Sequence, residues 1–184
     1  MNGHGHCSSP RVGVHAARRL SDFSYQGPHS YSVTCCTFAR RPSFQHDGIV
    51  ASSSEQLLQL SLQEHFAVLA YCFMPDHVHL LVEGLQASSD LRRLMARWKQ
   101  RTGYDHSRAT GERLWQAGFF DHVLREEEDR LSVVAYILAN PVRAGLVTHP
   151  SDYPSWGSSV WTRAELIESL FNRHGGESDN HRGG

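Results

Sequence analysis

Two histidines one residue apart have a spacing suited to binding a metal ion. His77 and His79 lie in the segment HVHLLVEG, whose apolar and β-branched residues predict a β-strand. Alternate side chains of a strand share a face, so both imidazoles would project together while Val78 points the other way. Two neighbouring imidazoles can chelate a divalent cation. The chain holds 13 histidines, so two unrelated surface histidines are the alternative interpretation.

A tyrosine and an asparagine form a second pair. Tyr136 and Asn140 stand at positions i and i+4 of a segment predicted to be helical, so they would share one face of that helix. Pro141 disfavours helical geometry in the residue before it and predicts that the helix ends near Asn140. Tyr136 could then act as a nucleophile, with the Asn140 amide oxygen as a ligand to a metal held mainly by the histidines. The alternative is a core aromatic residue followed by an asparagine that caps the helix.

Alternating strands and helices would position these residues. The expected order is β, α, β-hairpin, α, β, α, with the hairpin turning at Met74-Pro75-Asp76. This order predicts an α+β fold class, namely a ferredoxin-like antiparallel sheet with helices packed on one face. The other expected elements are a strand at 30–38, a loop at 42–48, a helix starting at 54–55, a helix after the cap residues 88–90, a polar connection at 103–111 and a strand at 119–124.

Composition limits the class of protein. The segment at 1–27 is expected to be a flexible arm, 28–156 the main domain, and 157–184 a short helix near 164–171 with a disordered tail. No apolar run approaches the ~20 residues that span a bilayer, and the first ten residues lack the apolar stretch of a signal peptide. We therefore expect a cytoplasmic protein with no membrane partner. The four cysteines show no C-x-x-C spacing, which favours buried, reduced thiols.

The charge of the chain does not by itself indicate a nucleic-acid partner. The formal net charge is −1. The simplest interpretation of the basic clusters is a helix face exposed to solvent. Lys99 is the single lysine, so nearly all the positive charge is guanidinium, which suits bidentate contact with phosphate. Trp98 is interpreted as a core residue, with stacking on a base as the alternative. The candidates for backbone contacts are Arg92, Arg93, Arg97, Lys99 and Arg101.

Several stretches together resemble one family of enzymes. The stretch YCFMPDHVHLLV at 71–82 resembles the strand of the single-tyrosine HUH transposases, in which two histidines flank a bulky hydrophobic residue. The stretches WQAGFFDHVLR at 115–125 and YILANPVRAGLV at 136–147 resemble the tyrosine-helix region of one branch, the REP-associated tyrosine transposases. The segments YSVT and TFARR at 31–41 resemble the first strand of that family. The resemblance covers roughly residues 23–156.

The resemblance implies an HUH endonuclease-like fold and a role for each matching residue. His77, His79 and Asn140 would hold Mg²⁺ or Mn²⁺, and Tyr136 would attack a phosphodiester to leave a 5′-phosphotyrosine. The substrate implied is single-stranded DNA flanked by hairpins, which the enzyme would cut and rejoin. His122 belongs to a shared stretch, and its role stays open.

Two rival functions and one departure from the family pattern remain. A catalytically silent DNA-hairpin-binding regulatory protein would keep the fold without the chemistry. A metal-dependent phosphodiesterase would act through water, with Tyr136 in a structural role. Asp76 stands where many relatives have asparagine, which brings an extra carboxylate near the histidines. The oligomeric state, monomer or homodimer, is left open.

Overall fold

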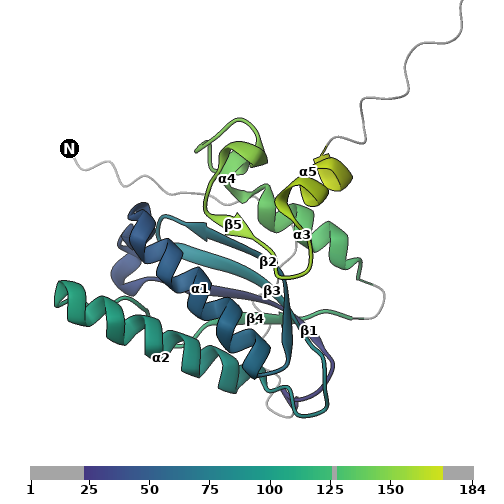
Figure 1. Cartoon of the computed structure of the whole chain (residues 1–184), viewed down its shortest axis with the longest axis horizontal. Helices are drawn as coiled ribbons and strands as arrows, with labels where there is room; N and C mark the ends of the chain where they lie inside the picture. Colours follow the sequence, from purple (N-terminus) through teal and green to yellow (C-terminus); the bar gives the residue numbers. More distant parts are fainter. Residues whose placement is uncertain (1–22, 126–127, 172–184) are drawn as a thin grey trace, which may run out of the picture.

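A five-stranded antiparallel sheet forms the centre of the protein (Figure 1). The computed structural model describes residues 23–125 and 128–171. The sheet order is β4-β1-β3-β2-β5, which places β1 and β3 side by side in its middle. The strands are β1 (Ser30–Cys36), β2 (Phe66–Met74), β3 (His77–Gly84), β4 (Phe120–Val123) and the two-residue β5 (Trp156–Gly157).

The order of strands confirms the expected fold class. The chain runs β1, α1, β2, β3, α2, β4, and the first four strands assemble in the order 4-1-3-2, which is the split βαβ arrangement of ferredoxin-like folds. The β2–β3 hairpin is antiparallel, with Met74 opposite His77 across its tight turn. Strand β5 pairs with the outer edge of β2.

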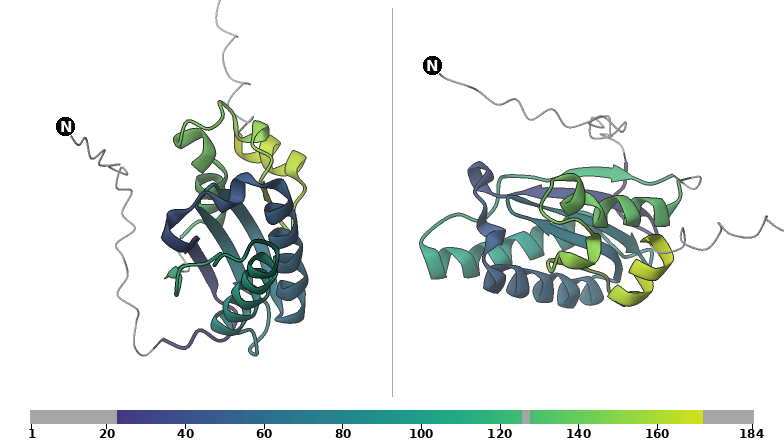
Figure 2. Two further views of the ribbon diagram at one scale, coloured as in Figure 1. Left: turned by 90° about the vertical axis from the view of Figure 1, so that its left-hand side faces the viewer. Right: turned by 90° about the horizontal axis from the view of Figure 1, so that it is seen from above.

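Helices cover both faces of the sheet, whereas the sequence led us to expect one covered face. Helices α1 (Asp47–Gln63) and α2 (Leu91–Thr110) pack on one side, and α3 (Arg130–Leu138), α4 (Asn140–Arg143) and α5 (Arg163–Phe171) lie on the other (Figure 2). The central strands are apolar on both sides, since Leu80 belongs to the first core and Leu81 to the second. A sheet buried on two faces needs an apolar layer against each.

Two helices are longer than the sequence indicated. Helix α1 begins at Asp47, where we expected a loop. The negative charge of Asp47 stabilises the positive N-terminal end of the helix dipole, and Val50 is buried in the first core. Helix α2 begins after its N-cap Asp90 as predicted, but it continues to Thr110 through the expected polar connection. Its last turns bury Thr102 and His106, and left-handed Gly111 ends it.

The ends of the domain differ slightly from the expected bounds. Tyr25 is buried, so the ordered fold begins before residue 28. The short C-terminal helix is confirmed as α5, while residues 1–22 and 172–184 lie outside the described residues. Cys35, Cys36 and Cys72 are buried free thiols, as expected, and Cys7 lies outside the described part. None of the helices in the described ranges is long and apolar enough to cross a bilayer.

Candidate active site

The β2–β3 hairpin delivers both histidines to one spot on the sheet. Val78 and Leu80 point into the core beneath α1 and α2, so His77 and His79 face the side that carries α3. Their Nε2 atoms are 3.0 Å apart, and the two rings stand at 89° with their centroids 4.6 Å apart. The expectation that this pair shares a face is thus met, and its nitrogens converge on one point.

The other nitrogen of each imidazole is held by a neighbouring oxygen. His77 Nδ1 lies 2.6 Å from Asp76 Oδ1, and His79 Nδ1 lies 3.0 Å from Thr34 Oγ1. Thr34 is the residue directly opposite His79 on the paired strand β1. Oxygens at Nδ1 leave the Nε2 atoms, which face each other, as the available ligand atoms.

The environment keeps His79 neutral at physiological pH. Burial, together with the neighbouring His77, Arg40 and Arg143, lowers the pKa of His79 to about 3. A neutral imidazole has the lone pair that a metal ion needs. His79 is therefore prepared for coordination without first losing a proton.

The tyrosine lies on the helix that covers this part of the sheet. Helix α3 packs on β2 and β3 through Val134, Ile137 and Leu138, which leaves Tyr136 at the surface with 36% of its area exposed. The Arg143 guanidinium lies over the Tyr136 ring, 4.4 Å from its centroid. The positive charge of Arg143 also contributes to lowering the pKa of His79.

Asn140 lies beyond the helix that carries Tyr136. We expected the two residues on one helix, but α3 ends at Leu138 and Asn140 starts the short helix α4. Pro141 accounts for the break, because its ring restricts the preceding residues and it lacks an N–H. Asn140 Nδ2 donates to the carbonyl oxygens of Tyr136, at 3.0 Å, and Ile137, at 3.2 Å. The amide thus caps α3, and its Oδ1 points away from those carbonyls.

The two histidine nitrogens can hold a metal ion only together with oxygen ligands from other groups. Within residues 23–125 and 128–171, no group of three or more His, Cys, Asp or Glu side chains is arranged to hold a metal. Two convergent imidazole nitrogens supply part of a coordination shell. The Asn140 amide oxygen, water and phosphate oxygens are the kinds of ligand that would complete it for Mg²⁺ or Mn²⁺.

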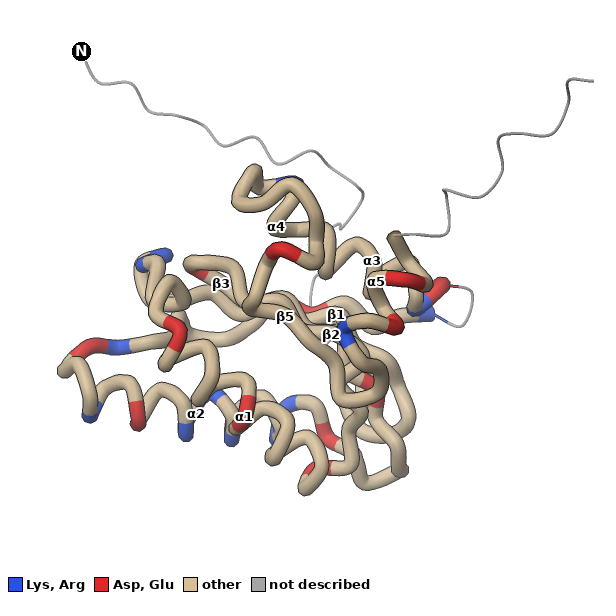
Figure 3. The backbone as a smooth tube through the Cα atoms, turned by 45° about the horizontal axis from the view of Figure 1, so that its top comes forward, with Lys and Arg blue, Asp and Glu red and all other residues tan. Residues whose placement is uncertain are grey.

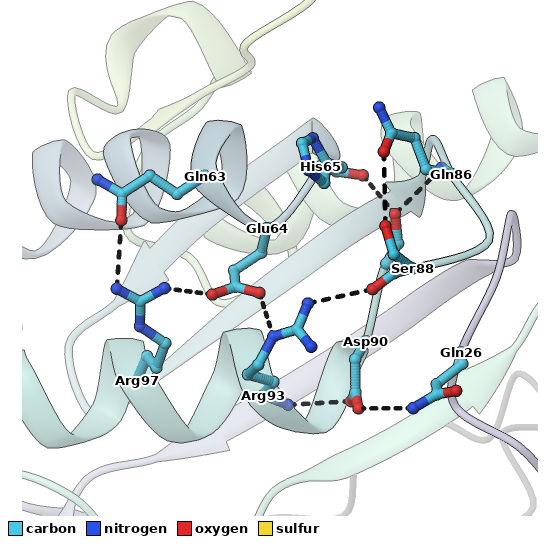
Figure 4. Close-up of polar contacts among 10 residues, drawn as sticks. Gln26, Gln63, Glu64, His65, Gln86, Ser88, Asp90, Arg93 and Arg97 are labelled. Atoms are coloured by element: carbon cyan, nitrogen blue, oxygen red, sulfur yellow. Dashed lines mark hydrogen bonds and ion pairs between the residues drawn. The ribbon is translucent and has the colours of Figure 1, made fainter.

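All five basic residues suggested as phosphate contacts lie on the other face of the sheet. They belong to α2, along which basic positions recur (Figure 3). Arg93 and Arg97 form ion pairs with Glu64 at the end of α1 (Figure 4). Burial raises the pKa of the Glu64 carboxyl, but the two guanidinium groups outweigh burial and hold it below its ordinary value. Lys99 donates to the Gln116 carbonyl at 2.8 Å.

Trp98 is a core residue, as the sequence indicated. It is fully buried, and its Nε1 donates to the Ser53 carbonyl at 2.9 Å. His122 lies on β4, where its Nε2 is 3.0 Å from the Glu128 carboxylate; within the described residues it forms no hydrogen bond with His77 or His79.

Three neighbours of the site could not be singled out from the sequence. Thr34 lies in a strand and Arg143 is the last residue of the short helix α4; only folding places Thr34 beside His79 and Arg143 over Tyr136. Thr37 is fully buried; its N–H donates to the Asp76 carbonyl oxygen at 3.0 Å, and its hydroxyl is shared between the carbonyl oxygens of Arg41, at 2.7 Å, and Asp76, at 2.9 Å. The strand pairing of β1 with β3 was the missing information.

Comparison with known proteins places this site in a family. A family model described as "Transposase IS200 like" matches residues 26–140, which is more than half of the chain and includes the histidine pair, Tyr136 and Asn140. The chain belongs to the IS200-like transposase family. Within this family, the resemblance to REP-associated tyrosine transposases is confirmed by the relatives.

Two curated relatives and one solved structure show the extent of the likeness. A REP-associated tyrosine transposase of Escherichia coli K12 is 26% identical over 99 residues, covering 53% of this chain and 58% of that protein. Its Haemophilus influenzae counterpart is 27% identical over 101 residues, covering 48% of this chain and 57% of that protein. The chain therefore matches somewhat more than half the length of these relatives.

The fold agrees with that of a solved member of the group. The structure of a REP-associated tyrosine transposase bound to a REP hairpin superposes with a TM-score of 0.64 and 21% identity, covering 88% of this chain and 94% of that one. The likeness confirms the α+β fold of this IS200-like chain.

Proposed function

We propose that the protein is a metal-dependent single-stranded DNA endonuclease and strand transferase that acts through a covalent bond between Tyr136 and a 5′-phosphate. The observation that carries the proposal is the convergence of the His77 and His79 Nε2 atoms on the sheet face covered by the tyrosine helix, where the Arg143 guanidinium lies over the Tyr136 ring. Membership of the IS200-like transposase family supports it.

Each residue has a role in the proposed reaction. His77, His79 and the Asn140 amide oxygen would hold Mg²⁺ or Mn²⁺, which when bound neutralises charge on the scissile phosphate. The Tyr136 oxygen attacks phosphorus, the bond from phosphorus to the 3′-oxygen breaks, and that oxygen takes up a proton as the tyrosine hydroxyl loses one. The Arg143 guanidinium stabilises negative charge on the tyrosine oxygen and on the phosphate. A second 3′-hydroxyl reverses the step and joins strands.

The exposure of Tyr136 favours a single-stranded substrate. A nucleophile on a helix at the protein surface can reach a phosphate that bends into the site, whereas a stacked duplex holds its phosphates on a regular backbone. The solved relative binds a REP hairpin. We propose accordingly that the substrate is a single strand flanked by a hairpin.

The test is a denaturing gel of the protein with labelled single-stranded DNA carrying hairpins from its genomic neighbourhood, with Mn²⁺ or with EDTA. We expect a Mn²⁺-dependent band of protein joined to DNA, lost in Tyr136→Phe and in His79→Gln. Tyr153→Phe is the matched control, because the Tyr153 hydroxyl donates to the Phe73 carbonyl at 2.7 Å and its ring packs against the second core.

Two results would each contradict the proposal. Cleavage without an adduct that survives Tyr136→Phe would indicate a phosphodiesterase acting through water. Tight hairpin binding without cleavage or adduct, across a panel of hairpins, would indicate a silent DNA-binding protein.

A further inference from the structure

We infer that Asp76, held by Arg40, is a positioning residue that fixes the tautomer and orientation of His77 for metal binding. The inference rests on the proposed function, because it concerns the same histidine pair. It adds a chain of contacts from Arg40 through Asp76 to His77, called the relay below, which joins the segment after β1 to the β2–β3 turn.

The carboxylate decides which nitrogen of His77 carries the proton. Asp76 Oδ1 lies 2.6 Å from His77 Nδ1, and an ionised carboxylate can only accept a hydrogen bond. A neutral His77 must therefore carry its proton on Nδ1. Its Nε2 then holds a lone pair directed at the point that it shares with His79. This is the carboxylate–histidine–metal arrangement that commonly orients metal ligands.

Arg40 makes a carboxylate the required group at position 76. Its Nε lies 3.3 Å from Asp76 Oδ2, so the two carboxylate oxygens serve different partners. An asparagine could accept from His77 through its oxygen, but its amide N–H₂ would then face the Arg40 guanidinium, and two donors would meet. Asp76 is thus matched by the arginine beside it.

The backbone holds both members of the relay in place. The Thr37 N–H donates to the Asp76 carbonyl oxygen at 3.0 Å, and its hydroxyl lies within hydrogen-bond distance of the same oxygen. The Phe44 N–H donates to the neighbouring Pro75 carbonyl at 3.0 Å. Arg40 has φ of +56° and follows Ala39 at +54°, a conformation that L side chains rarely adopt. Such strain at a non-glycine turn is typical of a position where function fixes the geometry. Arg40 Nη1 also donates to Cys36 Sγ at 3.1 Å.

The tautomer can be measured without any metal. Long-range ¹H–¹⁵N spectra of the metal-free protein should show His77 as the Nδ1–H form. Asp76→Ala should shift His77 towards a mixture with the Nε2–H form. A wild-type His77 protonated on Nε2 would overturn the inference.

Mn²⁺ affinity supplies the second measurement, by titration followed with electron paramagnetic resonance. Loss of an outer partner of a metal-bound histidine typically weakens affinity by about 10- to 100-fold. We expect a loss in that range for Asp76→Ala and Asp76→Asn, and a smaller loss for Arg40→Gln that disappears when position 76 is already Asn. Arg41→Gln is the matched control, since Arg41 pairs instead with Glu112 at 2.8 Å.

The outcomes separate the inference from the proposed function. If wild-type protein binds Mn²⁺ and Asp76→Asn binds it within about twofold, the positioning role is refuted while the metal site stands. If wild-type protein binds no Mn²⁺, both fail. Asp76→Asn keeps the backbone carbonyl that Thr37 holds, and equal thermal unfolding temperatures in EDTA would show that the variant folds.

Discussion

The stability of the metal-free protein should fall in weak acid, and His79 should contribute to that fall. Its pKa is lowered from 6.5 to about 3 by burial, with the nearby positive groups adding to the effect. Below pH 6.5 the unfolded chain takes up a proton at this histidine while the folded protein does not. Folding stability is therefore lost as the pH falls below 6.5, and the loss continues until the pH approaches 3.

The magnitude follows from the linkage relation. A proton bound only by the unfolded state changes the free energy of unfolding by about 1.4 kcal/mol per pH unit. From pH 7.5 to pH 4.5, His79 should therefore remove about 2.5 kcal/mol of stability. This figure is an upper limit, because the side chain keeps some contact with solvent.

The assay is urea unfolding in EDTA at pH 7.5, 6.5, 5.5 and 4.5, for wild-type protein and His79→Gln. His106 has a pKa that burial also lowers, so the wild-type slope contains a second contribution that the comparison cancels. Carboxylates with lowered pKa, such as Glu64, act mainly below this range. We expect a shallower decline for His79→Gln. Parallel curves for the two proteins would refute the reasoning.

Two further substitutions test the backbone. Gly84→Ala would place Cβ 2.2 Å from the Gly27 carbonyl oxygen, and should lower the free energy of unfolding by about 3 kcal/mol, whereas the control Gly48→Ala, with no atom within 4 Å, should not lower it. Equal free energies of unfolding for these two variants, measured in urea, would contradict the close approach of Gly84 to the Gly27 carbonyl oxygen. Ala39→Gly relieves a φ of +54° and should raise the unfolding free energy by about 1 kcal/mol, and a lower value would show that the turn is not strained.

The apolar, β-branched and aromatic runs were enough to predict the strands, and with them the face shared by the histidines. His77 and His79 flank Val78, and a period of two cannot place them otherwise once the segment is a strand. The break between Tyr136 and Asn140 was foreseen only in part, since Pro141 indicated an end but not the second short helix that follows it.

The surroundings of the site depended on contacts between distant segments. Thr34 lies 45 positions from His79 in the chain, and the pairing of β1 with β3 brings them together. The length of α2 was underestimated because Gly103 and the polar residues after it read as a connection, whereas burial of Thr102 and His106 stabilises the helix there. The ion pairs of Arg93 and Arg97 with Glu64 could not be predicted either, because they depend on the packing of the end of α1 beside α2.

The most direct test of the account is to find which amino acid becomes joined to DNA. The protein should be incubated with Mn²⁺ and a hairpin-flanked single strand, digested with nuclease and protease, and its peptides sequenced by mass spectrometry. We predict a nucleotide attached through a 5′-phosphate to the Tyr136 side chain, and no such peptide from the His79→Gln protein. A nucleotide on another residue, or cleaved DNA with every tyrosine unmodified, would contradict the central claim.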